Sequence, residues 1–133
     1  EVDGLDAKKV KRVVLCCGKV YYDLVNARRE KKITDIAIVR LEQLYPFPKE
    51  SLEKELSKYP KATEIVWAQE EPRNQGAWYW IASRHHLDSQ ISGKQKMLLV
   101  SRPASSSPAV GYLAKHNEQQ KALIESALGK IEY

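Results

Sequence analysis

Short, nearly continuous apolar runs recur along the chain and are typical of strands covered on both faces. They begin at Val13, Ile33, Ile65 and Met97. The first run ends at Gly18, the second reaches Val39, and the third stops before a polar segment at 69–72. The pattern predicts buried strands at about residues 13–17, 33–39, 65–68 and 97–100.

Segments with apolar residues at helical spacing alternate with these runs. The expected helices begin near Val20, Pro48, Ala77 and Pro108. Pro48 and Pro108 suit first helical positions, where the missing amide hydrogen of proline costs little. Ser107 is a suitable cap for the last helix and Gly129 a suitable stop, whereas Pro60 ends the second helix.

Strands that alternate with helices predict a mostly parallel sheet, because parallel neighbours need crossover connections. We expect a three-layer α/β/α sandwich. A chain of 133 residues with 43% hydrophobic residues is the size of one domain with one core. Its polar opening is typical of a linker from an upstream domain, so we expect a linker at 1–11 and the folded domain at 12–133.

The net charge of +5 comes from 22 Lys and Arg against 17 Asp and Glu, spread over a chain rich in both signs. This mixed pattern argues against a nucleic-acid partner. Two short basic runs contain Lys8, Lys9, Lys11 and Arg12, and Arg28, Arg29, Lys31 and Lys32. Because both runs include or adjoin acidic residues, we expect solvated helix ends and a linker.

The cysteines, Cys16 and Cys17, are adjacent in the sequence. A disulfide between neighbours needs strained geometry, so a reducing compartment fits best. No apolar stretch approaches the roughly 20 residues that cross a bilayer, and the acidic start does not resemble a signal segment. We expect no membrane partner.

Candidate acid and base groups are Glu70 and Glu71, which lie where the third strand should end. Ligands usually bind at that edge of an open α/β sheet, and adjacent carboxylates can raise one pKa. A structural role is favoured, in which one carboxylate caps the turn at 74–76 or pairs with Arg73. The chain has no dinucleotide fingerprint, no phosphate loop and no nucleophile with an evident base, so an independent enzyme is not expected.

The candidates for an anion site are Lys19, Arg102, Ser105, Ser106 and Ser107. Lys19 stands at the start of the first helix, and the others lie between the fourth strand and the last helix. Helix starts present free amide hydrogens and a partial positive charge. Each group alone is more often an exposed lysine or a cap, but parallel strands bring both helix starts to one edge. A phosphate site at this edge is therefore a hypothesis.

Four segments carry a more specific signal. They are GKVYYDL at 18–24, IVRLEQLYP at 38–46, QEEPRNQGAW at 69–78 and RPASSSPAVG at 102–111. Together they resemble the carboxyl-terminal domain of the 2-oxoglutarate dehydrogenase family, in the same order and over nearly the entire chain. Cys17 stands where a serine commonly precedes the Gly-Lys pair, a change that weakens a phosphate contact.

The resemblance implies a fold like the last domain of transketolase, in an enzyme that uses thiamine diphosphate and magnesium. That enzyme decarboxylates 2-oxoglutarate in the tricarboxylic acid cycle and passes succinyl to the lipoyl arm of dihydrolipoyl succinyltransferase, in a complex with dihydrolipoyl dehydrogenase. Its cofactors are held by preceding domains, so none is expected on this one, which lacks a Gly-Asp-Gly segment. The last domain contributes to the homodimer and to regulation by adenine nucleotide or acyl-coenzyme A.

The same resemblance suggests roles for the segment 69–78. Asn74, Gln75 and Gly76 would form a turn at the active edge, with Gly76 allowing close backbone approach. Trp78 and Trp80 would reach a subunit surface. Two alternatives stay open, namely the same domain of a 2-oxoadipate dehydrogenase and a free-standing nucleotide-sensing module. Bacterial cytoplasm is the expected location, and the mitochondrial matrix is the alternative.

Overall fold

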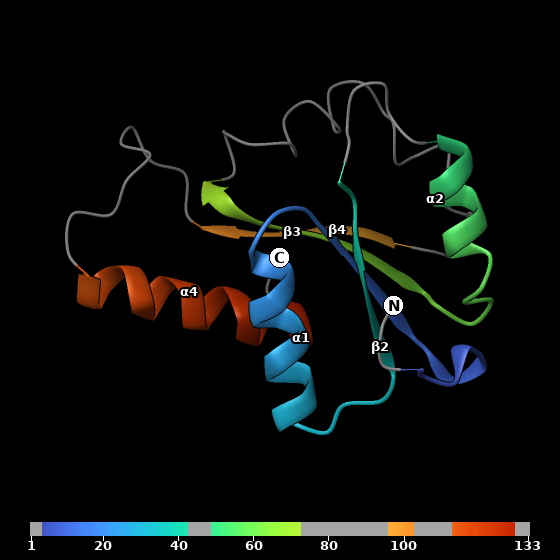
Figure 1. The fold of residues 1–133 in the computed structure, drawn as a ribbon, viewed down its shortest axis with the longest axis horizontal. Coiled ribbons are helices and arrows are strands. Elements are labelled where there is room, and N and C mark those ends of the chain that lie inside the picture. The colour runs from blue at the N-terminus through green and yellow to red at the C-terminus, as the bar shows by residue number, and fades with distance from the viewer. Residues whose placement is uncertain (1–3, 43–48, 73–95, 103–112, 130–133) are drawn as a thin grey trace.

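The computed structural model describes residues 4–42, 49–72, 96–102 and 113–129 (Figure 1). The elements in chain order are η1 (Ala7–Lys9), β1 (Arg12–Cys16), α1 (Val20–Glu30), β2 (Ile36–Arg40), α2 (Lys49–Leu56), β3 (Glu64–Pro72), β4 (Lys96–Arg102) and α4 (Leu113–Leu128). The helix expected from Ala77 and the start of the last helix expected at Ser107 and Pro108 lie outside the described residues.

The described strands form one parallel sheet in the order β2-β1-β3-β4. All four predicted strands are confirmed, and two of them differ from the predicted range by three residues or more at one end. β2 begins only at Ile36, because the amide of Ile33 donates to the carbonyl of Arg28 at 3.2 Å and so belongs to the end of α1. β3 continues to Pro72, which pairs with Arg102 of β4 beyond an irregularity in the register.

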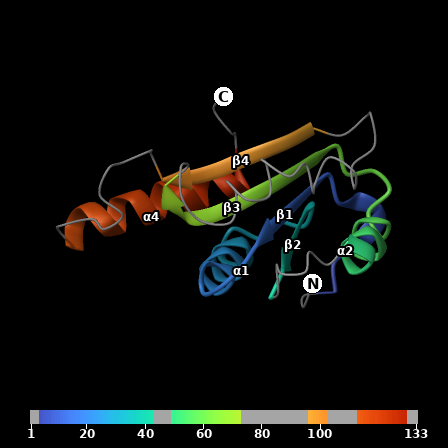
Figure 2. The same cartoon turned by 90° about the horizontal axis from the view of Figure 1, so that it is seen from above.

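Helices cover both faces of this sheet and give the predicted three-layer α/β/α sandwich. Side chains of α1 and α4 share one core cluster with the sheet, and side chains of α2 share the other. β1 serves both clusters because its side chains alternate, with Val14 and Cys16 on one face and Val13 and Leu15 on the opposite face. Figure 2 shows β1 and β2 between α1 and α2.

The first described residues already contact the core. Val10 is completely buried in the α2 cluster, and Leu5 and Ala7 pack against it. The boundary between linker and domain at residue 11 stays a prediction. None of the described helices is long and apolar enough to cross a membrane.

The prediction that both basic runs are solvated is wrong for two arginines. Arg12 donates to the carbonyls of Ala127 at 2.9 Å and Gly129 at 2.6 Å, at the end of α4. Its guanidinium also pairs with Glu64 at 3.1 Å. Arg28 is only 1% exposed. A guanidinium finds enough partners in the tertiary structure to be buried, whereas the neighbouring basic side chains are exposed, namely Lys8, Lys9, Lys11, Arg29, Lys31 and Lys32.

Candidate functional site

The carboxyl edge of the sheet contains a topological switch point, at which successive connections lead to opposite sides of β1. From β1 the chain passes through α1 to β2 on one side, and later through α2 to β3 on the other side of β1. In open α/β sheets, ligands bind outside the carboxyl ends of the strands at such a switch point. The candidate site therefore lies where residues 17–19 follow β1 and residues 69–71 end β3.

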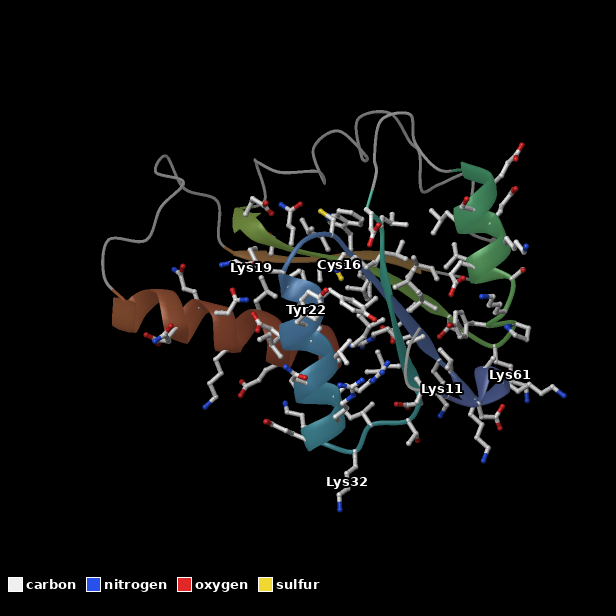
Figure 3. All side chains as sticks on the ribbon, viewed as in Figure 1. Lys11, Cys16, Lys19, Tyr22, Lys32 and Lys61 are labelled. Carbon is white, nitrogen blue, oxygen red and sulfur yellow. The ribbon has the colours of Figure 1, made fainter. Side chains whose placement is uncertain are left out.

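The turn after β1 is open to solvent. Gly18 has a φ of 76°, which favours glycine, and a Cβ built there would have nothing within 4 Å. Lys19 is the N-cap residue of α1, is exposed, and makes no side-chain hydrogen bond to the helix. Figure 3 shows Lys19 and Cys16 at the same end of the sheet. The start of α1 thus presents a cation to solvent, whereas the amides of Tyr21 and Tyr22 already donate to the carbonyls of Gly18 at 3.3 Å and Lys19 at 3.1 Å.

The end of β3 is held by a short chain of hydrogen bonds. The buried indole of Trp67 donates to the side-chain oxygen of Gln69 at 3.0 Å. The amide nitrogen of Gln69 in turn donates to the carbonyl of Glu71 at 3.2 Å. Because Gln69 is only 3% exposed, these bonds fix the irregular part of β3 from within the core. Glu70 is left half-buried and Glu71 exposed.

The two thiols at this edge are free and stay protonated at neutral pH. Burial, and then the neighbouring Cys17, raises the pKa of Cys16 to about 12, although Arg40 opposes the shift. Burial also raises the pKa of Cys17, and the negative charge of Glu71 adds to the effect. Neither thiol is activated as a nucleophile, because it is the thiolate that reacts. The effect of Glu71 also indicates that its carboxylate lies close to the turn after β1.

Lys19 and Arg102 lie at the same edge with β3 between their strands. Arg102 is the last residue of β4 and pairs in register with Pro72 of β3. Neighbouring strands are about 4.8 Å apart, so β1 and β4 are on the order of 10 Å apart. A ligand shared by the two cations stays a prediction. Ser105, Ser106 and Ser107 lie outside the described residues.

The segment expected to form a turn or an interface is only partly described. Glu70 and Glu71 are the last residues of β3 before Pro72. The proposed capping of the turn at 74–76 cannot be placed, because Asn74, Gln75, Gly76, Trp78 and Trp80 lie outside the described residues.

Sequence reasoning missed a cation at this edge, Arg40 at the end of β2. Its guanidinium lies 5.2 Å from the ring centroid of Tyr21 and 5.4 Å from that of Tyr22. It donates to the hydroxyl of Tyr22 at 2.9 Å and pairs with Glu42. The available signal was that Arg40 directly follows the predicted strand 33–39, but only the pairing of β2 with β1 brings it to the first turn of α1.

Metal chemistry finds no support in the part of the chain that the structure describes. No group of three or more His, Cys, Asp or Glu side chains there is arranged to hold a metal ion. The described residues therefore do not fit a magnesium site.

The sheet order and the helical layers define an α/β domain of the transketolase type. A split-gene transketolase, described as an inactive β4 tetramer, aligns with a TM-score of 0.60 over 91% of this chain and 39% of its own. At 16% identity, this likeness shows the fold alone.

The chain belongs to the family described as 2-oxoglutarate dehydrogenase C-terminal, whose profile matches residues 1–128. Relatives named 2-oxoglutarate dehydrogenase E1 component are 59% identical in Cupriavidus necator, 56% in Haemophilus influenzae and 52% in Azotobacter vinelandii. These alignments cover 96% to 97% of this chain but only 13% to 14% of each relative. The chain thus corresponds to a small part of proteins that carry the full name.

Proposed function

We propose that the chain serves as the carboxyl-terminal domain of an E1 component that decarboxylates 2-oxoglutarate with thiamine diphosphate and magnesium. The family match and the names of the relatives support this assignment. The names of the relatives also favour 2-oxoglutarate over 2-oxoadipate as the substrate. The reacting groups belong to other domains of that enzyme, because the described residues have no metal cluster and both thiols have raised pKa values.

Release of carbon dioxide by the full-length enzyme tests this assignment. The enzyme should turn over 2-oxoglutarate in the presence of thiamine diphosphate and magnesium, and 2-oxoadipate more slowly. Faster turnover of 2-oxoadipate would favour the alternative enzyme.

Within that enzyme, the domain supports assembly and regulation. Its carboxyl edge binds an anionic effector, a phosphate of an adenine nucleotide or of acyl-coenzyme A. The observation that carries this proposal is the all-parallel sheet, which directs the open turn at Gly18 and the end of β4 toward one edge. The charge of Lys19 supplies attraction, and a guanidinium such as that of Arg102 binds two phosphate oxygens at once.

The carboxylate of Glu71 restricts which anion suits this edge. It lies close enough to the turn after β1 to raise the pKa of Cys17, so a small, highly charged anion loses part of its attraction there. A larger ligand can place a phosphate near Lys19 and a hydrogen-bond donor near Glu71. An adenine ring, with its exocyclic amino group, has this combination.

The charge-reversing change Lys19→Glu in the full-length enzyme tests the effector site. A hydrogen bond to a charged group contributes about 1.5 to 3 kcal/mol, so effector affinity should fall about ten-fold or more. The measurement is turnover as a function of added nucleotide or acyl-coenzyme A. Lys121→Glu, an exposed lysine of α4, is the control and should leave the response unchanged. An unaltered response in Lys19→Glu would remove the proposed site.

We also propose a second copy of the enzyme, the upstream domains, dihydrolipoyl succinyltransferase and dihydrolipoyl dehydrogenase as partners. The E1 component named in the relatives implies a complex of several components. The bacterial sources of these relatives support the bacterial cytoplasm as the location.

A further inference from the structure

Arg40 ends β2 at the carboxyl edge of the sheet, one strand from the turn after β1. It pairs in register with Cys16, the last residue of β1. Neighbouring strands are about 4.8 Å apart, so Arg40 is closer to this turn than Arg102, which lies two strands away on β4. The charge of Arg40 also opposes the raised pKa of Cys16, as expected for a guanidinium close to the end of β1. Arg40 is therefore a cation of the proposed effector edge.

The guanidinium of Arg40 is held in place by α1. It lies 5.2 Å from the ring centroid of Tyr21 and 5.4 Å from that of Tyr22, and it donates to the hydroxyl of Tyr22 at 2.9 Å. A guanidinium packed on aromatic rings loses less side-chain freedom when it binds an anion, because its orientation is already restricted. The Arg40 side chain is 31% exposed, so a ligand in solvent can reach it.

The anion that Arg40 binds in this structure is a carboxylate of its own segment. Glu42, two residues along the chain, accepts a hydrogen bond from the guanidinium. The Glu42 side chain is 72% exposed, and a surface pair of this kind contributes little stability because water screens it. Glu42 can therefore turn into water at small cost and leave the guanidinium to another anion.

Two other carboxylates near this edge limit which anion can bind. Asp23 accepts from Gln120 of α4, so it lies on the side of α1 that faces α4. Glu71 lies near Cys17, at the turn after β1. A single carboxylate of a ligand has no advantage over Glu42, which is tethered beside Arg40 at a high effective concentration. A diphosphate has more charge and more acceptor oxygens, and so can compete with Glu42.

The ring of Tyr22 indicates the rest of the ligand. Tyr22 is 56% exposed and is the one large hydrophobic side chain that is exposed among the residues that the structure describes. Exposed aromatic rings provide stacking surfaces for nucleobases. Because Tyr22 also contacts Arg40, a base and a diphosphate can be bound side by side. Adenosine diphosphate has these two parts, and it is contained in an acyl-coenzyme A as well.

We propose that Arg40 binds the diphosphate of an adenosine diphosphate unit, and that Glu42 occupies Arg40 until this ligand displaces it. The inference rests on the proposed function, because it assigns a binding residue and a regulatory exchange to the effector edge. Glu42 is then an internal competitor of the effector, so its removal should strengthen effector binding.

Calorimetry on variants of the full-length enzyme tests the exchange, with ADP and acetyl-coenzyme A as separate probes. The enzyme is first saturated with thiamine diphosphate and magnesium, so that ADP does not enter a cofactor site. Arg40→Gln should weaken binding about ten-fold, because a charge-assisted hydrogen bond is lost. Glu42→Gln should strengthen binding about two- to five-fold, because the competing carboxylate is neutralised.

The double variant separates this exchange from a general effect of charge. Arg40→Gln combined with Glu42→Gln should bind as weakly as Arg40→Gln alone, since Glu42 acts only through Arg40. Glu30→Gln removes the same charge at the exposed far end of α1 and should bind like the parent. Stronger binding by Glu42→Gln cannot come from a damaged fold, which would bind the probes less well. Inorganic pyrophosphate, which has no base to stack on Tyr22, should bind more weakly than ADP.

Each outcome supports or overturns the exchange. Binding of either probe with the expected order of variants supports it, and the probe that binds identifies the source of the diphosphate. A Glu42→Gln enzyme that binds no better than the parent overturns it, as does pyrophosphate that binds as well as ADP. If Lys19→Glu abolishes binding but the Arg40 and Glu42 variants bind like the parent, only this inference fails. If neither probe binds the parent, the effector edge fails too, whereas carbon dioxide release still tests the assignment to the enzyme.

Discussion

Arg28 shows how a single residue of a basic run acquires a structural role. The carbonyl of Asp35 accepts from Arg12 of β1, and the amide of Leu41 donates to β1 as well. Alternation along β2 therefore turns the carbonyl of Ile36 away from β1, to the side on which no strand of the described residues pairs. The guanidinium of Arg28 donates to that carbonyl at 3.1 Å. A buried side chain thus covers a backbone group that would otherwise be available for pairing with another strand.

Arg28→Met should destabilise the chain by about 1 to 3 kcal/mol, because the buried carbonyl of Ile36 loses its partner. Urea unfolding measures the loss. Lys121→Met places the same side chain at an exposed position of α4 and should cost less than about 0.5 kcal/mol. Equal losses in the two variants would show that the bond to Ile36 contributes nothing.

The buried thiol of Cys16 should make stability depend on alkaline pH. Its pKa is about 12 in the folded chain against an ordinary value of 9.0, so the unfolded chain loses its proton first. The stabilisation is complete below about pH 9 and is lost as the pH rises toward 12. By about pH 10.5 the parent should lose on the order of 1 to 2 kcal/mol more than Cys16→Val. Unfolding curves of both proteins across this range check the difference, and parallel curves would contradict it.

At the scale of elements, the end of β3 controls the surroundings of the turn after β1. The bonds from Trp67 to Gln69 and from Gln69 to Glu71 tie the irregular part of the strand to the core. This tie keeps the carboxylate of Glu71 near Cys17, where its charge contributes to the raised thiol pKa. Local pattern predicted the strand only as far as residue 68, because the polar residues 69–71 resemble a loop.

Glu71→Gln should lower the pKa of Cys17 and increase its rate of alkylation near pH 8, since one of the two causes of the raised pKa is removed. Burial remains the larger cause, so we expect an increase of only about two- to three-fold. Iodoacetamide labelling followed by mass spectrometry measures the rate. Glu70→Gln is the matched control and should leave the rate unchanged. The proximity of Glu71 to the turn would be refuted by identical rates in all three proteins.

For the whole molecule, parallel strands give the two ends of the sheet different chemistry. The carboxyl edge contains the start of α1, the end of β3, and Arg40 against two tyrosines. The amino edge contains the exposed Lys11 and Lys61 and the Arg12 contacts with the end of α4. Neither edge, within the described residues, has a metal-binding cluster.

The chain by itself should neither bind thiamine diphosphate with magnesium nor release carbon dioxide from 2-oxoglutarate. Its described residues lack a metal cluster, and its sequence lacks the Gly-Asp-Gly segment. Calorimetry and a carbon-dioxide assay measure the two properties, with the full-length enzyme as the positive control. Turnover by the chain alone would show that the catalytic groups are within it.

The sequence by itself determined how many of the described segments are strands and where they follow one another along the chain. It also determined the helices α1 and α2 and the fold class. These features depend on local spacing, because strands and helices repeat within a few residues. The motifs at 18–24, 38–46, 69–78 and 102–111 were also enough to indicate the family that the profile match confirms.

Only the tertiary structure decided which polar groups meet. Arg12 contacts Glu64 across 52 positions and Ala127 across 115, and no local pattern reports such pairs. The same holds for Arg40 on the tyrosines of α1 and for the amide of Thr63, which donates to the carbonyl of Lys11. Burial of a charge depends on whether distant backbone and carboxylate groups converge on it, and that convergence exists only once the sheet has its strand order.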